Sequence, residues 1–343
     1  MWQSYLTIVS PQCKSVRLFT SIFKNHQRVK LPNHLPRNDD RMVKINWILA
    51  MSMLVNCSIG CTVSDRSKQQ NIEQNPQQSD PDRTQIASSL ERHSKLQILL
   101  PLYIYPNWYD KNKYVWKQVT AAAKKVPIVV IINPSNGPDR AAPNSDYQQG
   151  IRDLHQAGIK VMGYVPTNYA KRDLQAVEAD IDLYIKHFNI EGIFLDEATS
   201  TQNKHSYYQQ IYRYIKSRSL SNNSHQRDYT VIINPGVAVD EAYLSQPVAD
   251  TIAIFENYQK AWDSYRPPSY INKYHPQNFA ALIHTTANRK LLKSTLDRVA
   301  KSRIGYVYVT NDTPDTIDRN PWDSLPEYWQ AEVNYIQQLN LIE

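Results

Sequence analysis

From residue 96 onward, short apolar runs alternate with segments of helical periodicity, and this alternation constrains the fold more than any other sequence feature. Strand-sized runs separated by helices are typical of a parallel sheet with crossover helices. Eight runs close a (β/α)8 barrel, and about 250 residues is the usual length of that fold. The sequence therefore predicts the α/β class, with a single (β/α)8 TIM-type barrel over residues 96–343. The eight runs are 96–105, 128–133, 160–165, 192–196, 230–234, 251–256, 279–284 and 304–310.

Helical periodicity fills most of the intervals between these runs. The connections after the fifth and sixth runs are shorter and less regular than the others. No second domain is expected beside the barrel. The predicted helices are 114–125, 147–157, 174–188, 207–218, 290–301 and 328–339.

The chain before the barrel has the composition of an export leader followed by a tether. Lys44 precedes a short apolar stretch, 47–55, and small or polar residues lead to Cys61, which is the arrangement of a signal peptide. The residues around Cys61 resemble a lipoprotein signal in which that cysteine is lipidated, and a plain secretory signal is the alternative. Residues 62–95 are polar and predict a flexible linker. We expect a leader over residues 1–61 and a protein that is secreted or displayed at the cell surface, touching the membrane only through a lipid anchor or an uncleaved leader.

The amino-acid composition excludes thiol chemistry in the predicted barrel and argues against nucleic-acid binding. Cys13, Cys57 and Cys61 all precede residue 62, so the barrel has no thiol for a nucleophile, a metal site or a disulfide. The net charge is +7, but Lys and Arg are scattered, whereas nucleic-acid binding needs a concentrated basic patch. Tyrosine is abundant at 23 residues, and such rings suit sugar binding as well as ordinary cores.

Carboxylates follow two of the predicted strands. In a (β/α)8 barrel the C-terminal ends of all strands share the face that carries the chemistry. Asp196 and Glu197 end the fourth run and Glu256 ends the sixth. Side chains alternate along a strand, so both Asp196 and Glu197 can reach the cleft only if the backbone bends there. A helix cap is the alternative for Asp196 and Glu197, and a salt bridge at the rim is the alternative for Glu256.

A pair of carboxyl groups is what glycosidic bond cleavage requires. One group protonates the leaving oxygen, and the other stabilises or attacks the sugar carbon. Aromatic, amide and hydroxyl side chains at the other strand ends are candidates for holding the sugars. A structural histidine is the alternative for His284, and strand-terminating turns are the alternative for Asn133 and Asn234. The candidate substrate-binding residues are Tyr103, Tyr105, Asn133, Tyr164, Asn234, Tyr258, His284, Thr310 and Asp312.

The order of these motifs resembles the spherulin-4 (spherulation-specific family 4) proteins over nearly all of residues 96–343. That family includes the glycoside hydrolase family 135 enzymes, which are (β/α)8 barrels that cleave α-1,4-linked N-acetylgalactosamine stretches in exopolysaccharides. The resemblance implies that the acidic cluster falls on Asp196, Glu197 and Glu256, and that no metal or other cofactor is needed. The matching segments are 101–106, 131–134, 137–138, 163–165, 192–197, 234–236, 255–256 and 308–310.

We therefore expect an exported endo-acting glycosidase that cleaves an α-1,4-linked galactosamine- or N-acetylgalactosamine-containing exopolysaccharide, as found in biofilms. Retention of configuration predicts a carboxyl separation of about 5 Å and inversion one of about 8 Å, and a separation beyond about 10 Å would exclude the assignment. One alternative is a catalytically weak glycan-binding barrel displayed for adhesion. Another is a metal-dependent barrel that uses Asp196, Glu197, His284 and Asp312.

Overall fold

The computed structural model describes residues 94–139, 142–220, 228–317 and 319–342. The predicted leader, its lipidation site at Cys61 and residues 62–93 of the predicted linker lie outside this part of the chain. Within the described segments, no helix combines the length and the apolar character that crossing a membrane requires.

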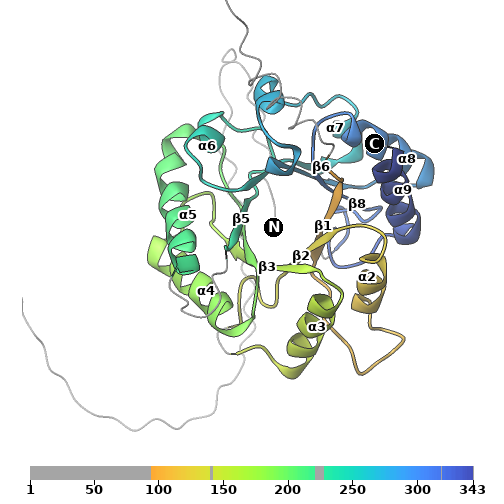
Figure 1. The fold of residues 1–343 in the computed structure, drawn as a ribbon, viewed down its shortest axis with the longest axis horizontal. Helices are drawn as coiled ribbons and strands as arrows, with labels where there is room; N and C mark the ends of the chain where they lie inside the picture. The colour runs from red at the N-terminus through yellow and green to blue at the C-terminus, as the bar shows by residue number, and fades with distance from the viewer. Residues whose placement is uncertain (1–93, 140–141, 221–227, 318, 343) are drawn as a thin grey trace, which may run out of the picture. The chain divides into compact units, whose positions relative to one another are not determined.

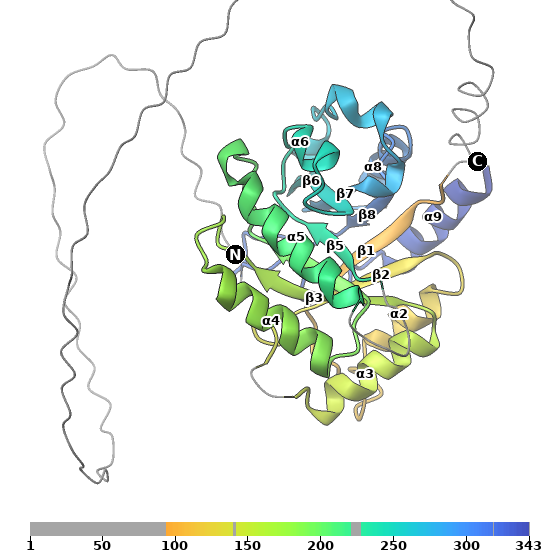
Figure 2. The same cartoon turned by 60° about the vertical axis from the view of Figure 1, so that its left-hand side comes forward.

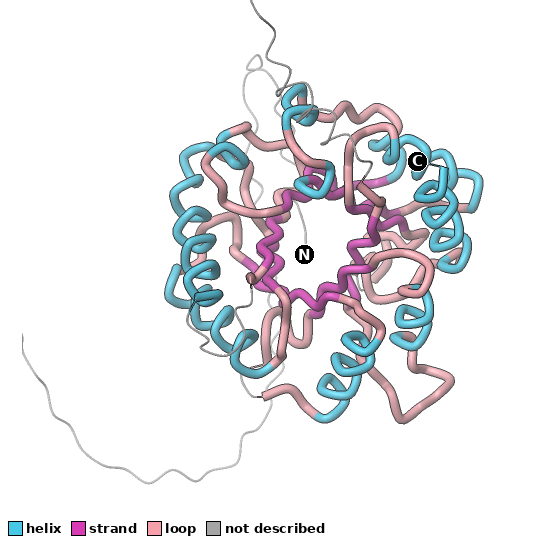
Figure 3. Tube along the Cα trace, in the orientation of Figure 1, coloured by secondary structure: helices cyan, strands magenta, loops and turns pink. Residues whose placement is uncertain are grey.

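Eight parallel strands form a closed barrel, which confirms the predicted fold class. Each strand pairs with its neighbours in sequence, and β8 returns to pair with β1. Figure 1 looks into the ring of strands, and Figure 3 shows the same ring surrounded by helices. The strands are β1 Gln97–Leu102, β2 Ile128–Ile132, β3 Lys160–Pro166, β4 Gly192–Asp196, β5 Thr230–Ile233, β6 Thr251–Tyr258, β7 Phe279–His284 and β8 Tyr306–Val309.

Helices cover the outside of the strand ring, as the two views in Figures 1 and 2 show. Asn144, Asp173 and Asn288 cap three of them by accepting hydrogen bonds from backbone N–H groups of the first turn. After β5 and β6 the described helices are only four residues long, as the weak periodicity there predicts. The helices are α2 Trp116–Ala122, α3 Ser145–Gln156, α4 Leu174–His187, α5 His205–Leu220, α6 Ala242–Ser245, α7 Gln259–Trp262, α8 Arg289–Ala300 and α9 Trp329–Ile342, with short 3-10 turns η1 Gln202–Lys204, η2 Ser269–Lys273 and η3 Pro276–Asn278.

The strands are buried on both faces, which explains their continuous apolar sequences. All of β2 is buried and consists only of Ile and Val, whose branched side chains pack well on a pleated sheet. Gly192 opens β4 where there is no room for a side chain, because a Cβ there would lie 2.1 Å from the Thr230 carbonyl oxygen and 2.5 Å from the Met162 methyl group. The close packing of β3, β4 and β5 therefore depends on this glycine.

Strand β6 contains an irregularity just before the predicted acid. Its register against β7 shifts between Ala253 and Phe255, after which Glu256 pairs with Leu282. An extra residue of this kind bends a strand and re-aims the side chains that follow. The register shift therefore sets the direction in which the side chain of Glu256 points from β6.

Candidate active site

Asp196 and Glu256 meet through a single amide on the strand between them. Asn234 directly follows β5, and its Nδ2 donates hydrogen bonds to Asp196 Oδ1 at 2.8 Å and to Glu256 Oε2. Since each such bond spans at most about 3.2 Å, the two carboxylate oxygens lie no more than about 6 Å apart. The separation therefore meets the condition set for a catalytic pair and falls near the value for retention.

Glu256 has the electrostatic surroundings of a proton donor. Burial of its carboxyl group, followed by the negative charge of Asp196, raises the pKa of Glu256 to about 7. Hydrogen bonds from Asn234 and from the side chain of Trp322 oppose this shift. A carboxyl group with a pKa near neutrality holds its proton for a substantial part of the time at pH 7, as general acid catalysis requires.

The carboxylate of Asp196, in contrast, accepts hydrogen bonds from two side chains. Besides the amide of Asn234, the Tyr164 hydroxyl forms a hydrogen bond with the Asp196 carboxylate. Burial and the charge of Asp196 raise the pKa of Tyr164, so its hydroxyl keeps the proton that it donates. The ring of Tyr103 packs edge-on against Tyr164 with centroids 5.6 Å apart. Two donors and a packed ring thus orient Asp196 as an acceptor.

Glu197 contacts the loop after β3 through both its backbone and its carboxylate. Its φ of 51° is the bend that the alternation of side chains predicts. Its carbonyl oxygen accepts hydrogen bonds from Thr167 Oγ1 at 2.9 Å and from the Tyr169 N–H at 2.6 Å. The Asn168 N–H donates to its carboxylate, while burial and then the charge of Asp196 raise the pKa of Glu197. Of the two adjacent acids, Asp196 is the one that shares a hydrogen-bond donor with Glu256.

The loop that holds Glu197 is strained. Asn168, Tyr169 and Ala170 have φ values of 47°, 55° and 59°, and a left-handed residue other than glycine costs about 1–2 kcal/mol. Tyr169 is half-buried, and burial together with the charges of Glu197, Asp196 and Glu256 raises its pKa. Its phenol therefore lies within the electrostatic reach of all three acids. Tyr169 follows the third predicted strand, but it is not among the candidate substrate-binding residues, because a left-handed aromatic residue leaves no signal in periodicity.

His284 packs between aromatic side chains, one of which, Trp322, forms a hydrogen bond with Glu256. Its ring packs edge-on against Tyr258 and Trp322, with centroid distances of 4.4 and 6.0 Å. Burial lowers the pKa of His284 to about 4, so the imidazole is neutral near pH 7. Its Nδ1 forms a hydrogen bond with Thr285 Oγ1 at 2.9 Å. Trp322 was not selected from the sequence because it lies in a loop, well past the end of β8.

Four of the predicted binding residues have structural partners away from the acid pair. The Tyr105 hydroxyl donates to Asp146 Oδ2 at 2.6 Å. Asn133 Oδ1 accepts the Gly137 N–H at 2.9 Å, which is the turn that was the alternative for this residue. The remaining two support the loop after β8: the buried Thr310 Oγ1 accepts the Asp312 N–H at 3.0 Å, and Asp312 Oδ2 accepts the Ser324 hydroxyl at 2.6 Å.

The metal-dependent alternative finds no support in the geometry. Among the described residues, no three or more His, Cys, Asp or Glu side chains are grouped so that they could hold a metal ion. His284 and Asp312 are each engaged in their own hydrogen bonds, as given above.

The fold and the site define a (β/α)8 barrel with an amide-bridged carboxylate pair at the C-terminal ends of β4 and β6. A family model described as spherulation-specific family 4 matches residues 97–336. The chain is 33% identical to Spherulin-4 of Physarum polycephalum over 254 residues, which is 71% of each chain. The chain belongs to the spherulation-specific family 4. The crystal structure of Aspergillus clavatus Sph3 in complex with GalNAc shares the fold, with a TM-score of 0.58 and 23% identity over 71% of this chain and 98% of that one.

Proposed function

We propose that this protein is a glycoside hydrolase that cleaves an N-acetylgalactosamine-containing polysaccharide within the chain, at α-1,4 linkages and with retention. The observation that carries the proposal is the Asn234 amide, which holds Asp196 and Glu256 within about 6 Å of each other. Membership of the spherulation-specific family 4 supports it, as does the complex of the structurally similar Sph3 with GalNAc.

Each acid has a role that follows from its surroundings. Glu256, with a pKa of about 7, donates a proton to the glycosidic oxygen as the bond breaks and later removes one from water. Asp196 either attacks the sugar carbon or orients the acetamido group that does so, and the Tyr164 hydroxyl and the Asn234 amide hold it in place. Glu197 tunes its neighbour and anchors the loop after β3.

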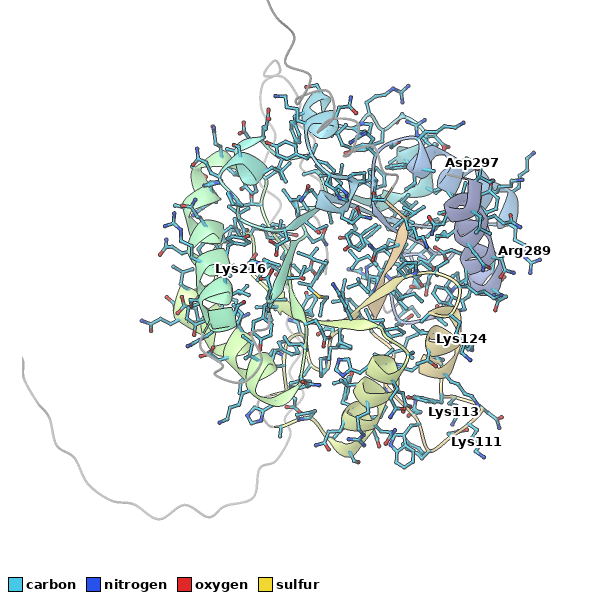
Figure 4. The ribbon with its side chains drawn as sticks, in the orientation of Figure 1. Lys111, Lys113, Lys124, Lys216, Arg289 and Asp297 are labelled. Atoms are coloured by element: carbon cyan, nitrogen blue, oxygen red, sulfur yellow. The ribbon has the colours of Figure 1, made fainter. Side chains whose placement is uncertain are left out.

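The test is release of oligosaccharides from a panel of amino-sugar polymers by the full chain. Asp196→Asn and Glu256→Gln should each lower the rate by at least about a hundredfold, the usual contribution of acid–base catalysis, with circular dichroism unchanged. Asp297→Asn and Glu178→Gln are matched controls, because these residues lie on α8 and α4, outside the strand ring, and should keep full activity (Figure 4). The anomeric form of the first product, read by NMR, tests retention.

The other outcomes separate the alternatives. Binding of a polymer without cleavage, unaffected by Glu256→Gln, would replace the proposal with a glycan-binding barrel used for adhesion. A protein that neither binds nor cleaves any glycan would overturn both the glycosidase proposal and the glycan-binding alternative. Loss of glycan cleavage in the presence of EDTA would support the metal-dependent alternative.

We also propose that the enzyme acts outside the cell, on the basis of the predicted leader. Mass spectrometry of the mature protein tests this directly. An N-terminus at a lipid-modified Cys61 would identify a lipoprotein, and an unmodified N-terminus near this position a secreted enzyme. A chain that retains residues 1–61 without export would contradict the prediction.

A further inference from the structure

The loop between β1 and α2 exposes three aromatic side chains within five residues. Tyr105, Trp108 and Tyr109 are 41%, 43% and 64% exposed, and we refer to them as the loop aromatics. Trp108 and Tyr109 pack edge to face, with centroids 6.3 Å apart. Exposed apolar surface that is concentrated in one place marks a binding site more often than scattered single residues do.

The polar edges of the loop aromatics are already occupied. Tyr105 and Trp108 donate to the two oxygens of Asp146, at 2.6 and 2.8 Å, and the Tyr109 hydroxyl donates to Asn107 Oδ1 at 3.0 Å. Asp146 belongs to the first turn of α3, where the helix dipole favours a negative charge. The rings are therefore held in place, and what they offer a ligand is their faces.

Ring faces without free polar edges suit the apolar face of a sugar ring. Four formal charges lie on this loop and at its anchor, and they cancel: Lys111 and Lys113 against Asp110 and Asp146. A balanced patch favours an uncharged ligand such as an N-acetylated sugar over a polyanion or an anionic membrane. Fixed rings also lose little conformational entropy on binding.

The same loop connects the aromatics to the acid pair. Tyr103 packs on Tyr164, which hydrogen-bonds to Asp196. Trp108 is five residues further along, so it lies within about 18 Å of Tyr103. The loop runs from the strand ring to the rim beside α3 (Figure 1), and Lys111 and Lys113 mark its outer part in Figure 4. Because both follow the C-terminal end of a strand, the loop aromatics and the acids belong to the same face of the barrel.

We propose that Trp108, supported by Tyr105 and Tyr109, forms an outer subsite that stacks on an uncharged sugar of a polysaccharide whose scissile bond lies between Asp196 and Glu256. This subsite rests on the proposed function and adds where the polymer extends beyond the acids. It should matter more for long substrates than for short ones, because its loop runs outward from the strand ring to the rim beside α3 (Figure 1).

The test compares a long polymer with a trisaccharide cleaved at the same linkage, using the full chain. Trp108→Ala should lower kcat/KM for the polymer about tenfold and leave the trisaccharide unchanged. Trp108→Phe keeps a ring face and should restore most of the loss, while Asp146→Ala frees two rings and should cause a smaller loss of the same kind. Leu341→Ala, an exposed apolar residue on α9, is the control that should change neither substrate.

Binding provides a readout that does not require turnover. In a Glu256→Gln background, Trp108→Ala should raise the Kd for the acetylated polymer about tenfold, with the melting temperature unchanged. Equal losses on polymer and trisaccharide, or no loss on either, would overturn the subsite while leaving the glycosidase intact. A change in sedimentation with unaltered polymer cleavage would assign the loop aromatics to an interface between copies and overturn it too. A wild-type chain that neither cleaves nor binds any glycan would overturn both the proposed function and the subsite.

Discussion

Replacing Asp196 with asparagine should lower the pKa of Glu256. The charge of Asp196 is the second cause of the raised value, after burial, and Asp196→Asn removes that charge while keeping the shape of the side chain. The change therefore isolates the electrostatic coupling of the pair from its packing. If Glu256 is the general acid, its protonated fraction at pH 7 should fall at the same time.

The structure gives the size of this effect. Two unit charges about 6 Å apart, at an effective dielectric constant of about 20, interact by about 3 kcal/mol, or about two pKa units. Solvent at the mouth of the barrel weakens the interaction, so we expect a fall of about one to two units. From about 7, the pKa of Glu256 should drop to between about 5 and 6 and stay above its ordinary value of 4.5, because burial remains.

Carboxyl-detected 13C NMR, with the resonance assigned through Glu256→Gln, measures the change. Urea denaturation offers a second readout: a folded pKa above the unfolded one contributes stability that is complete below pH 4.5 and is lost as the pH rises through 7. Glu256 should thus contribute a fall of at most about 3 kcal/mol to the free energy of unfolding of the wild type over this range, and about half as much to that of Asp196→Asn. An unchanged pKa of Glu256 in Asp196→Asn, or an equal drop in Asp297→Asn, would refute the coupling.

Three further predictions concern other parts of the barrel. Glu332 on α9 is fully buried, and its Oε1 accepts the Val309 N–H at 2.9 Å. Burial raises the pKa of Glu332 well above the usual range. Glu332→Gln should therefore be more stable than the wild type by about 1–3 kcal/mol at pH 7, and the two proteins should be equally stable below pH 4.5. Urea denaturation curves that show no such pH dependence would contradict this prediction. Gly192→Ala should destabilise the barrel by about 3 kcal/mol or more in thermal unfolding, because the new methyl group meets the Thr230 carbonyl oxygen, and a change below 1 kcal/mol would mean that the strands can separate there. Tyr169→Gly relieves the strain of a left-handed backbone conformation, so the free energy of unfolding should stay within about 1 kcal/mol of the wild-type value. Glycan cleavage should fall at least tenfold. Full activity of this variant would show that Tyr169 does not belong to the site.

The architecture was readable from local pattern. The predicted runs 192–196 and 279–284 coincide with β4 and β7, because a fully buried strand must be apolar along its whole length. The observed ends of two strands differ from the predicted ends, because strand pairing and not composition decides where a strand stops. Strand β6 continues to Tyr258 because that residue still pairs with His284, whereas β1 stops at Leu102 and leaves Tyr103 free to turn toward Tyr164.

The acids themselves were also predictable, since strand order in a barrel places Asp196 and Glu256 on one face whatever lies between them in sequence. Three features of the site emerge only in three dimensions: the Asn234 amide between the two carboxylates, the Trp322 hydrogen bond to Glu256 and the left-handed Tyr169. Apolar periodicity records which face of a strand or helix is buried, and burial is a property of each residue with its near neighbours in sequence. A bridging hydrogen bond depends instead on the distance between side chains from separate strands and loops, and only the closed barrel sets that distance.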